Sequence, residues 1–111
     1  MTAGLRLANA PPEDPSLPQL QDAILDAETL EQLFRDIQRC TVVSEVLLKG
    51  GALAMASEKS VPLDEALAAL REARVLGVQI RYWYDGAHWW DTLMRTPQGI
   101  RLIRIQHRLA G

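Results

Sequence analysis

The stretch RYWYDGAHWWDTLMRTPQG, from Arg81 to Gly99, contains all three tryptophans and both tyrosines of the 111-residue chain. Asp85-Gly86 stands between two aromatic-rich runs, and this dipeptide is typical of a type I′ hairpin, in which both central residues have positive φ. The segment TPQG, which begins at Thr96, indicates a second hairpin whose three-residue loop ends in a left-handed glycine. The two turns together predict a three-stranded antiparallel meander.

The two turns also predict which side chains of the meander share a face. The first turn pairs Tyr82 with Trp89, and a three-residue second loop then pairs Trp89 with His107. Because side chains alternate between the faces of a strand, one face collects most of the apolar residues and is expected to be the core. The residues expected on this core face are Val78, Ile80, Tyr82, Tyr84, Ala87, Trp89, Asp91, Leu93, Ile103, Ile105 and His107.

The opposite face is expected to be too polar for a buried layer and too aromatic for an ordinary solvent face. Arg81 falls opposite Trp90 on it, where a cation–π contact would contribute about 0.5–1 kcal/mol. Exposed Trp and Arg are typical of interface hot spots. We therefore predict a partner-binding site formed by Arg81, Trp83, His88, Trp90, Met94, Arg104 and Gln106, with Gln79, Thr92 and Leu102 on the same face. The alternatives are that a homodimer buries this face or that the chain's own loop around Leu53 and Met55 covers it.

The chain before the meander predicts helices and one strand. Apolar residues recur at helical spacing in LPQLQDAILDAETLEQLFRDIQRC (17–40) and in VPLDEALAALREARVLG (61–77). Between them, TVVSEVLLK (41–49) is rich in β-favouring residues and predicts a strand, with a continuation of the preceding helix as the alternative. The predicted fold class is therefore α+β: N-terminal helices, one strand, one helix, and then a three-stranded antiparallel meander packed against the helices.

Composition indicates one globular domain, with 48% hydrophobic and 23% charged residues. Four of the six prolines lie in NAPPEDPSLP (9–18), so residues 1–17 are expected to be a flexible arm and residues 18–111 the domain. The single Cys40 predicts no intrachain disulfide, and we find no signal peptide and no apolar run long enough to span a membrane. A cytoplasmic location is the resulting expectation.

Charge is uneven along the chain and raises the question of nucleic acid. Residues 66–111 contain seven arginines and three acidic residues, whereas residues 1–65 contain five basic and eleven acidic residues. Arginine interleaved with aromatic residues is typical of single-strand binders, which stack bases on a sheet face. The pI of about 5.6 argues against this class, because sequence-independent binding draws on many phosphate contacts.

The sequence predicts no catalytic, cofactor or metal site. Cys40, His88 and His107 lack metal-ligand spacing, and the predicted pairing puts the two histidines on opposite faces. Asp91, placed on the core face, is the one candidate acid or base. The structural alternative is that its carboxylate binds a backbone amide, Arg95 or a tyrosine hydroxyl.

The function predicted from these features is that of a non-catalytic accessory or adaptor protein. It docks on a larger protein through the Trp/Arg face, and it needs no cofactor and no membrane. The alternative is a small-ligand or single-stranded nucleic-acid binding module that uses the same face.

Overall fold

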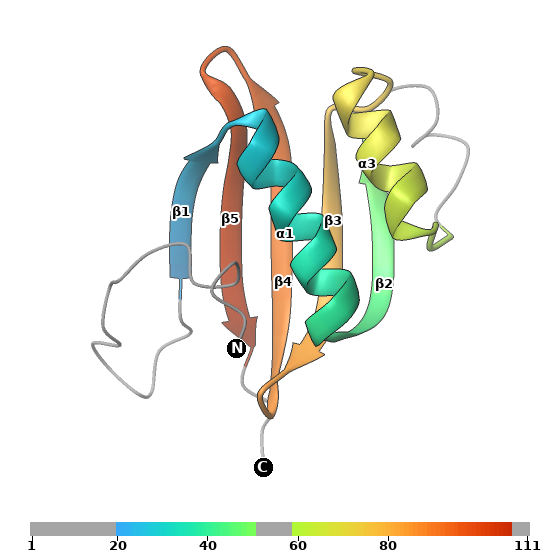
Figure 1. Ribbon diagram of the computed structural model, residues 1–111, viewed down its shortest axis with the longest axis vertical. Helices are drawn as coiled ribbons and strands as arrows, with labels where there is room; N and C mark the ends of the chain where they lie inside the picture. Colours follow the sequence, from blue (N-terminus) through green and yellow to red (C-terminus); the bar gives the residue numbers. More distant parts are fainter. Residues whose placement is uncertain (1–19, 51–58, 108–111) are drawn as a thin grey trace.

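The computed structural model describes residues 20–50 and 59–107, and the arm predicted for residues 1–17 lies outside them. Five strands form one antiparallel sheet in the order β1-β5-β4-β3-β2, and the helices α1 and α3 lie on the same face of it (Figure 1). The elements are β1 (Leu20–Leu25), α1 (Ala27–Cys40), β2 (Val42–Lys49), α3 (Leu63–Arg71), β3 (Gly77–Tyr84), β4 (Ala87–Thr96) and β5 (Gly99–His107).

The predicted fold class is wrong in two respects. The segment Leu20–Leu25, expected to be helical, is the edge strand β1, which pairs with β5. The strand β2 pairs with β3, so the sheet has five strands in place of a three-stranded meander. In β1 the alternation of half-buried Gln21 and Ala23 with exposed Asp22 and Ile24 has the period of a strand, and this pattern overrides the helical spacing.

The two helices begin and end where local chemistry allows. The Asp26 carboxylate accepts a hydrogen bond from the Thr29 backbone N–H at 2.8 Å and caps α1, so the chain turns from β1 directly into this helix. Arg39 lies in its last turn, where a cation is favoured. The helix α3 begins directly after its N-cap residue Pro62, and proline is tolerated there but not inside a helix because it has no backbone N–H. The two helices bury one face each, through Leu30, Leu33, Phe34 and Ile37 of α1 and Ala66, Ala69 and Leu70 of α3.

The first hairpin of the meander is confirmed. Tyr84 pairs with Ala87 across the two-residue turn, and Asp85 and Gly86 have φ values of 52° and 76°. The rest of the β3–β4 register follows as predicted, with Tyr82 opposite Trp89. The core face of this hairpin is therefore the one inferred from the sequence.

The second hairpin differs from the prediction by one residue. Thr96 pairs with Gly99, so the loop contains only Pro97 and Gln98. The Thr96 hydroxyl donates to the Gly99 carbonyl at 2.7 Å, and Gly99 has a φ of 134° that favours glycine. A Cβ there would lie 3.1 Å from the Leu25 carbonyl oxygen of β1. Gly99 therefore begins β5 in contact with its neighbouring strand and does not close a longer loop.

This shorter loop reverses the faces of every residue in β5. Leu102, Arg104 and Gln106 lie on the helix-covered face, whereas Ile103, Ile105 and His107 lie on the opposite face, because a one-residue shift exchanges the two sets. The prediction that Ile103, Ile105 and His107 belong to the core is therefore wrong.

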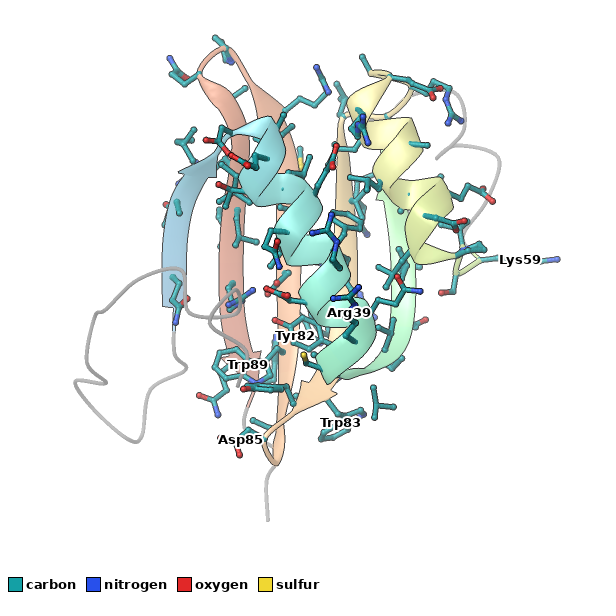
Figure 2. All side chains as sticks on the ribbon, in the orientation of Figure 1. Arg39, Lys59, Tyr82, Trp83, Asp85 and Trp89 are labelled. Atoms are coloured by element: carbon teal, nitrogen blue, oxygen red, sulfur yellow. The ribbon has the colours of Figure 1, made fainter. Side chains whose placement is uncertain are left out.

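The shifted register places Arg104 directly opposite Asp91 in the core. The two side chains are 2% and 0% exposed, and the guanidinium donates from Nε and Nη2 to the two carboxylate oxygens at 2.8 Å each. The Tyr82 hydroxyl, which lies behind the C-terminal half of α1 in Figure 2, is 3.1 Å from both oxygens. Burial raises the pKa of the Asp91 carboxyl, and hydrogen bonds from Arg104 and Tyr82 oppose that rise.

The expected partners of Asp91 are thus partly confirmed. A tyrosine hydroxyl does bind the carboxylate. Arg95 instead donates to the Leu70 carbonyl at the end of α3. The main partner, Arg104, was assigned to the wrong face. The carboxylate serves as a buried structural anchor between β3, β4 and β5.

Replacing Arg104 by methionine is expected to lower the free energy of unfolding by about 3–5 kcal/mol, because it leaves the Asp91 carboxylate buried without a counter-charge. A triple variant, Tyr82→Phe with Asp91→Leu and Arg104→Met, is expected to recover much of this loss, since no polar group of the cluster then remains buried. Urea titrations of the parent and both variants measure the difference. A triple variant less stable than Arg104→Met alone would contradict the anchoring role.

Candidate functional site

The sheet face opposite α1 and α3 is the candidate site, and we call it the open face. Both described helices pack on the other face, so the open face is covered by no helix of the described chain (Figure 1). Its members come from all five strands. They are Asp22 and Ile24 of β1, Val42, Glu45, Leu47 and Lys49 of β2, Gln79, Arg81 and Trp83 of β3, His88, Trp90, Thr92 and Met94 of β4, and Arg101, Ile103, Ile105 and His107 of β5.

The structure brings five of the seven predicted site residues together on this face. Arg81, Trp83, His88, Trp90 and Met94 lie on it, as expected from the first hairpin. The other two predicted members, Arg104 and Gln106, lie on the helix-covered face, and this assignment was wrong because of the β5 register. Ile103, Ile105 and His107 take their places. The open face is therefore more apolar than the sequence predicted.

Five side chains at one end of the open face form what we call the aromatic–histidine cluster: Arg81, Trp83, His88, Trp90 and His107. The His88 ring stacks on Trp83 with ring centroids 4.4 Å apart and an interplanar angle of 25°. The His107 ring lies 4.3 Å from the Trp90 ring, and the Arg81 guanidinium carbon is 3.8 Å from the same indole. Because β4 lies between β3 and β5, Arg81 and His107 approach Trp90 from its two sides.

Hydrogen bonds hold the Arg81 guanidinium in place over the indole. Nη1 donates to the Glu45 carboxylate at 2.9 Å, and Nε donates to the Gln79 side-chain oxygen at 3.0 Å. The Gln79 amide in turn donates to the Thr92 hydroxyl at 3.1 Å. The cation–π contact is therefore fixed by a polar network that neutralises the charge of Arg81.

Two nitrogen atoms of the cluster are buried without a hydrogen-bond partner, namely Trp90 Nε1 and His107 Nε2. Such atoms are uncommon in folded proteins, because an unpaired buried polar group loses its hydration without compensation. Each of the two nitrogens therefore lacks the hydrogen bond that a buried polar atom ordinarily makes.

The His88 imidazole favours its neutral form. Desolvation lowers the pKa of His88 most, electrostatic interactions with His107 and Arg81 lower it further, and Glu45 opposes them. The Ser44 hydroxyl lies 3.4 Å from Nε2 of this ring and is its hydrogen-bonding contact in the described chain. Both imidazoles are thus held by contacts with aromatic rings, stacked for His88 and tilted for His107, more than by hydrogen bonds.

The prediction that His88 and His107 lie on opposite faces of the sheet is wrong. His88 and His107 are direct cross-strand partners on the same face, with ring centroids 6.5 Å apart. Cys40 is exposed at the end of α1, on the other side of the sheet. Within residues 20–50 and 59–107, no group of three or more His, Cys, Asp or Glu side chains could hold a metal ion.

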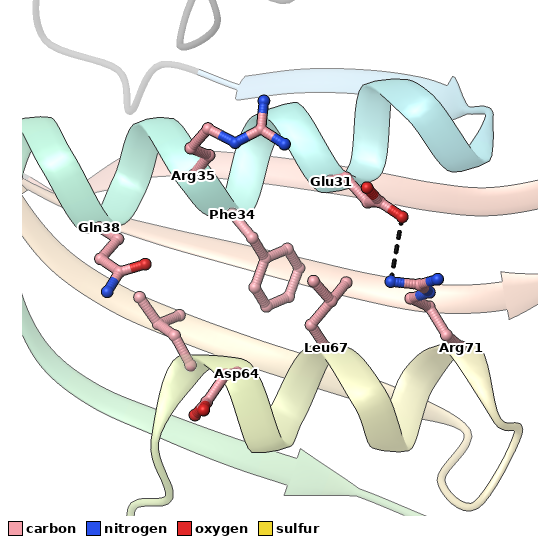
Figure 3. A pocket seen from close by; sticks show the side chains of 8 residues that line it. Glu31, Phe34, Arg35, Gln38, Asp64, Leu67 and Arg71 are labelled. Carbon is pink, nitrogen blue, oxygen red and sulfur yellow. Dashed lines mark ion pairs between the residues drawn. The ribbon is translucent and has the colours of Figure 1, made fainter.

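On the other side of the sheet, a groove lies between α1 and α3, with a volume of about 190 Å³ (Figure 3). The Glu31–Arg71 ion pair spans it at 3.0 Å, and both side chains are more than a third exposed. Exposed ion pairs of this kind contribute little and exchange readily with water. The lining combines a small apolar floor with solvated charges, so this groove is a weaker candidate than the open face. Its lining residues are Glu31, Phe34, Arg35, Gln38, Leu63, Asp64, Leu67 and Arg71.

In a pH titration of the histidine ring protons by NMR, His88 is expected to titrate below its ordinary pKa of 6.5. The unfolded chain then binds this proton more tightly than the folded chain does. The contribution of His88 to the free energy of unfolding is therefore complete above pH 6.5, and it declines as the pH falls through the folded-state pKa of His88. Arg81→Gln is expected to raise the midpoint, since it removes a positive charge and frees Glu45. A His88 midpoint at or above 6.5 in the parent protein would contradict the desolvated geometry.

Comparison with protein-family models, with curated proteins and with solved structures finds no match to this chain. Among the described residues, no helix is long and apolar enough to cross a membrane. The geometry of the open face is therefore the basis for inferring a function.

Proposed function

We propose that the chain is a non-catalytic docking module that binds the apolar surface of a larger protein through the open face. The observation that carries the proposal is the gathering of aromatic and aliphatic side chains on the sheet face that α1 and α3 leave uncovered. Trp83, Ile24 and Val42 on this face are 39%, 51% and 69% exposed. Val42 pairs with Trp83 at one end of the sheet, whereas Ile24 lies on the opposite edge strand. Exposed apolar side chains that gather on one face commonly mark a contact surface.

The distribution of charge on the open face supports a protein partner. Trp90, Ile103 and Ile105 occupy the middle strands, and an ion pair lies toward each edge of the sheet. Arg81 pairs with Glu45 at 2.9 Å on one side, and Arg101 pairs with Asp22 at 2.6 Å on the other. An apolar centre with a polar rim is the usual anatomy of a protein–protein interface.

The same ion pairs weigh against the nucleic-acid alternative. Both arginines of the open face already bind carboxylates, so neither is a free contact for phosphate. Affinity for single strands draws on backbone neutralisation as well as on stacking. The indole and imidazole rings of the aromatic–histidine cluster remain suited to contact with planar ligands. Binding of a single-stranded nucleic acid is therefore included as an outcome of the test.

The buried carboxylate supports a non-catalytic role. Asp91 is the candidate acid or base with a raised pKa, and it is 0% exposed beneath α1 with both oxygens bound by Arg104 and Tyr82. A general acid or base must reach the substrate proton directly or through one water molecule. The anchor geometry gives Asp91 no such access.

Trp90→Ala is expected to weaken the complex with the partner by about 2 kcal/mol or more, roughly 30-fold in Kd, because an indole at the centre of an interface is a hot-spot residue. The adjacent Trp89 points to the helix-covered face, where its ring packs on the core and Nε1 donates to the Tyr84 carbonyl at 3.2 Å. Trp89→Ala is therefore the matched control, expected to cost about 3 kcal/mol of folding stability and to leave affinity of the folded fraction nearly unchanged. Urea titration and quantitative pull-down from native lysate measure the two quantities.

Three outcomes would contradict the proposal. If Trp90→Ala captures the same proteins as the parent, with the same affinity, the open face is not the docking surface. If sedimentation velocity detects a parent dimer that Trp90→Ala abolishes, the occupant is a second copy of the chain. If a single-stranded oligonucleotide binds with an affinity that falls steeply with salt, the alternative function replaces this one.

A further inference from the structure

We propose that His88 and His107 bind one divalent transition-metal ion across β4 and β5. This inference is independent of the proposed docking function. It depends on the two-residue loop at Pro97-Gln98, which places these histidines directly opposite each other on the open face. They are the only two histidines of the chain.

The spacing of the two rings suits a chelate between neighbouring strands. Two imidazole nitrogens that each lie about 2.0–2.1 Å from one ion place their ring centres roughly 5–6 Å apart. The His88 and His107 centroids are 6.5 Å apart, with an angle of 52° between the rings. Coordination therefore requires a side-chain rotation that brings the rings together by roughly 1 Å and uncovers His107 Nε2, so that one nitrogen of each ring faces a shared ion.

Both imidazoles have nitrogen atoms available for coordination. His107 Nε2 is buried without a hydrogen-bond partner, and His88 Nε2 has only the long 3.4 Å approach to the Ser44 hydroxyl. No carboxylate in the described chain forms an ion pair with either ring; Glu45, the nearest acidic residue to act on His88, binds Arg81. The neutral imidazole is the form that binds a metal.

The chemistry of the pair selects the class of ion. Imidazole nitrogen favours Cu²⁺, Ni²⁺ and Zn²⁺ over Mg²⁺ or Ca²⁺, and Cu²⁺ binds most tightly within this series. Since the described residues supply no third His, Cys, Asp or Glu, water or a group from outside the chain fills the remaining positions. The site is therefore expected to be exchangeable and weaker than a three- or four-ligand structural site.

The fluorescence of the two indoles that contact the histidines reports directly on metal binding at this site. His88 lies against Trp83, and His107 lies against Trp90, at centroid distances of 4.4 and 4.3 Å. A paramagnetic Cu²⁺ ion bound to both imidazoles is expected to quench these two indoles more strongly than Trp89, which lies on the other face. Trp83→Phe with Trp90→Phe is thus expected to remove most of the quenching without removing the metal ligands.

The experiment uses tag-free full-length protein in a Cys40→Ser background, because the exposed thiol is itself a metal ligand. Cu²⁺ is titrated with tryptophan fluorescence as the readout, and Zn²⁺ is titrated by calorimetry at pH 7.5. The expected result is one ion per chain for each metal. His88→Gln and His107→Gln are each expected to weaken binding by about tenfold or more, because each removes one arm of a chelate. Circular dichroism checks that the variants keep the parent fold.

Three results would overturn the inference. The first is the absence of saturable binding at millimolar metal. The second is equal affinity of the parent and the His88→Gln/His107→Gln double variant, which would place the ion elsewhere. The third is a loss with only one of the single variants, which would indicate a lone imidazole in place of a cross-strand pair.

Discussion

The ion pair between Asp91 and Arg104 holds the central strand β4 and its neighbour β5 in one register. A slip of one residue in β5 would leave the Asp91 carboxylate alone under α1 and move the guanidinium to the opposite face. Removing one partner of a buried pair typically costs about 3–5 kcal/mol, comparable to much of the stability of a small domain. The pair therefore selects the register against its nearest competitor, and the residues that β5 contributes to the open face depend on that selection. Ile105 beside Trp90 and His107 opposite His88 both follow from it.

Arginine serves two different roles on the two faces of the same strands. Arg104 is buried, bidentate and bound to a carboxylate that is equally buried, so its contribution is to the folded state. Arg81 lies on the open face, paired with a half-exposed Glu45 and spread over the Trp90 ring. A planar guanidinium can satisfy both a carboxylate and an aromatic face, which a lysine ammonium does less well. The polar network thus orders the indole at the centre of the open face, which neither described helix covers.

Local sequence signals were sufficient to predict the first hairpin and α1. They were insufficient where two strands that lie far apart in the sequence pair with each other. Asp85-Gly86 has one favoured turn, so the β3–β4 register could be predicted, whereas TPQG is compatible with loops of two or three residues. The strand β1 pairs with β5 about eighty residues later, and no local pattern reports that contact. One signal was nevertheless present. A carboxylate on a predicted core face requires a counter-charge, and moving β5 by one residue supplies Arg104.

The separation of the two faces also explains why stability and binding can be changed independently in this fold. The helices, the apolar core and the Asp91–Arg104 pair all lie on one side of the sheet. The side chains of the open face make cross-strand contacts and two exposed ion pairs, which contribute little to folding. Folding therefore places few demands on residue type at positions such as Trp83 or Ile105, beyond a preference for β-favouring side chains. The proposed contact with another molecule would account for the aromatic and aliphatic character of these positions.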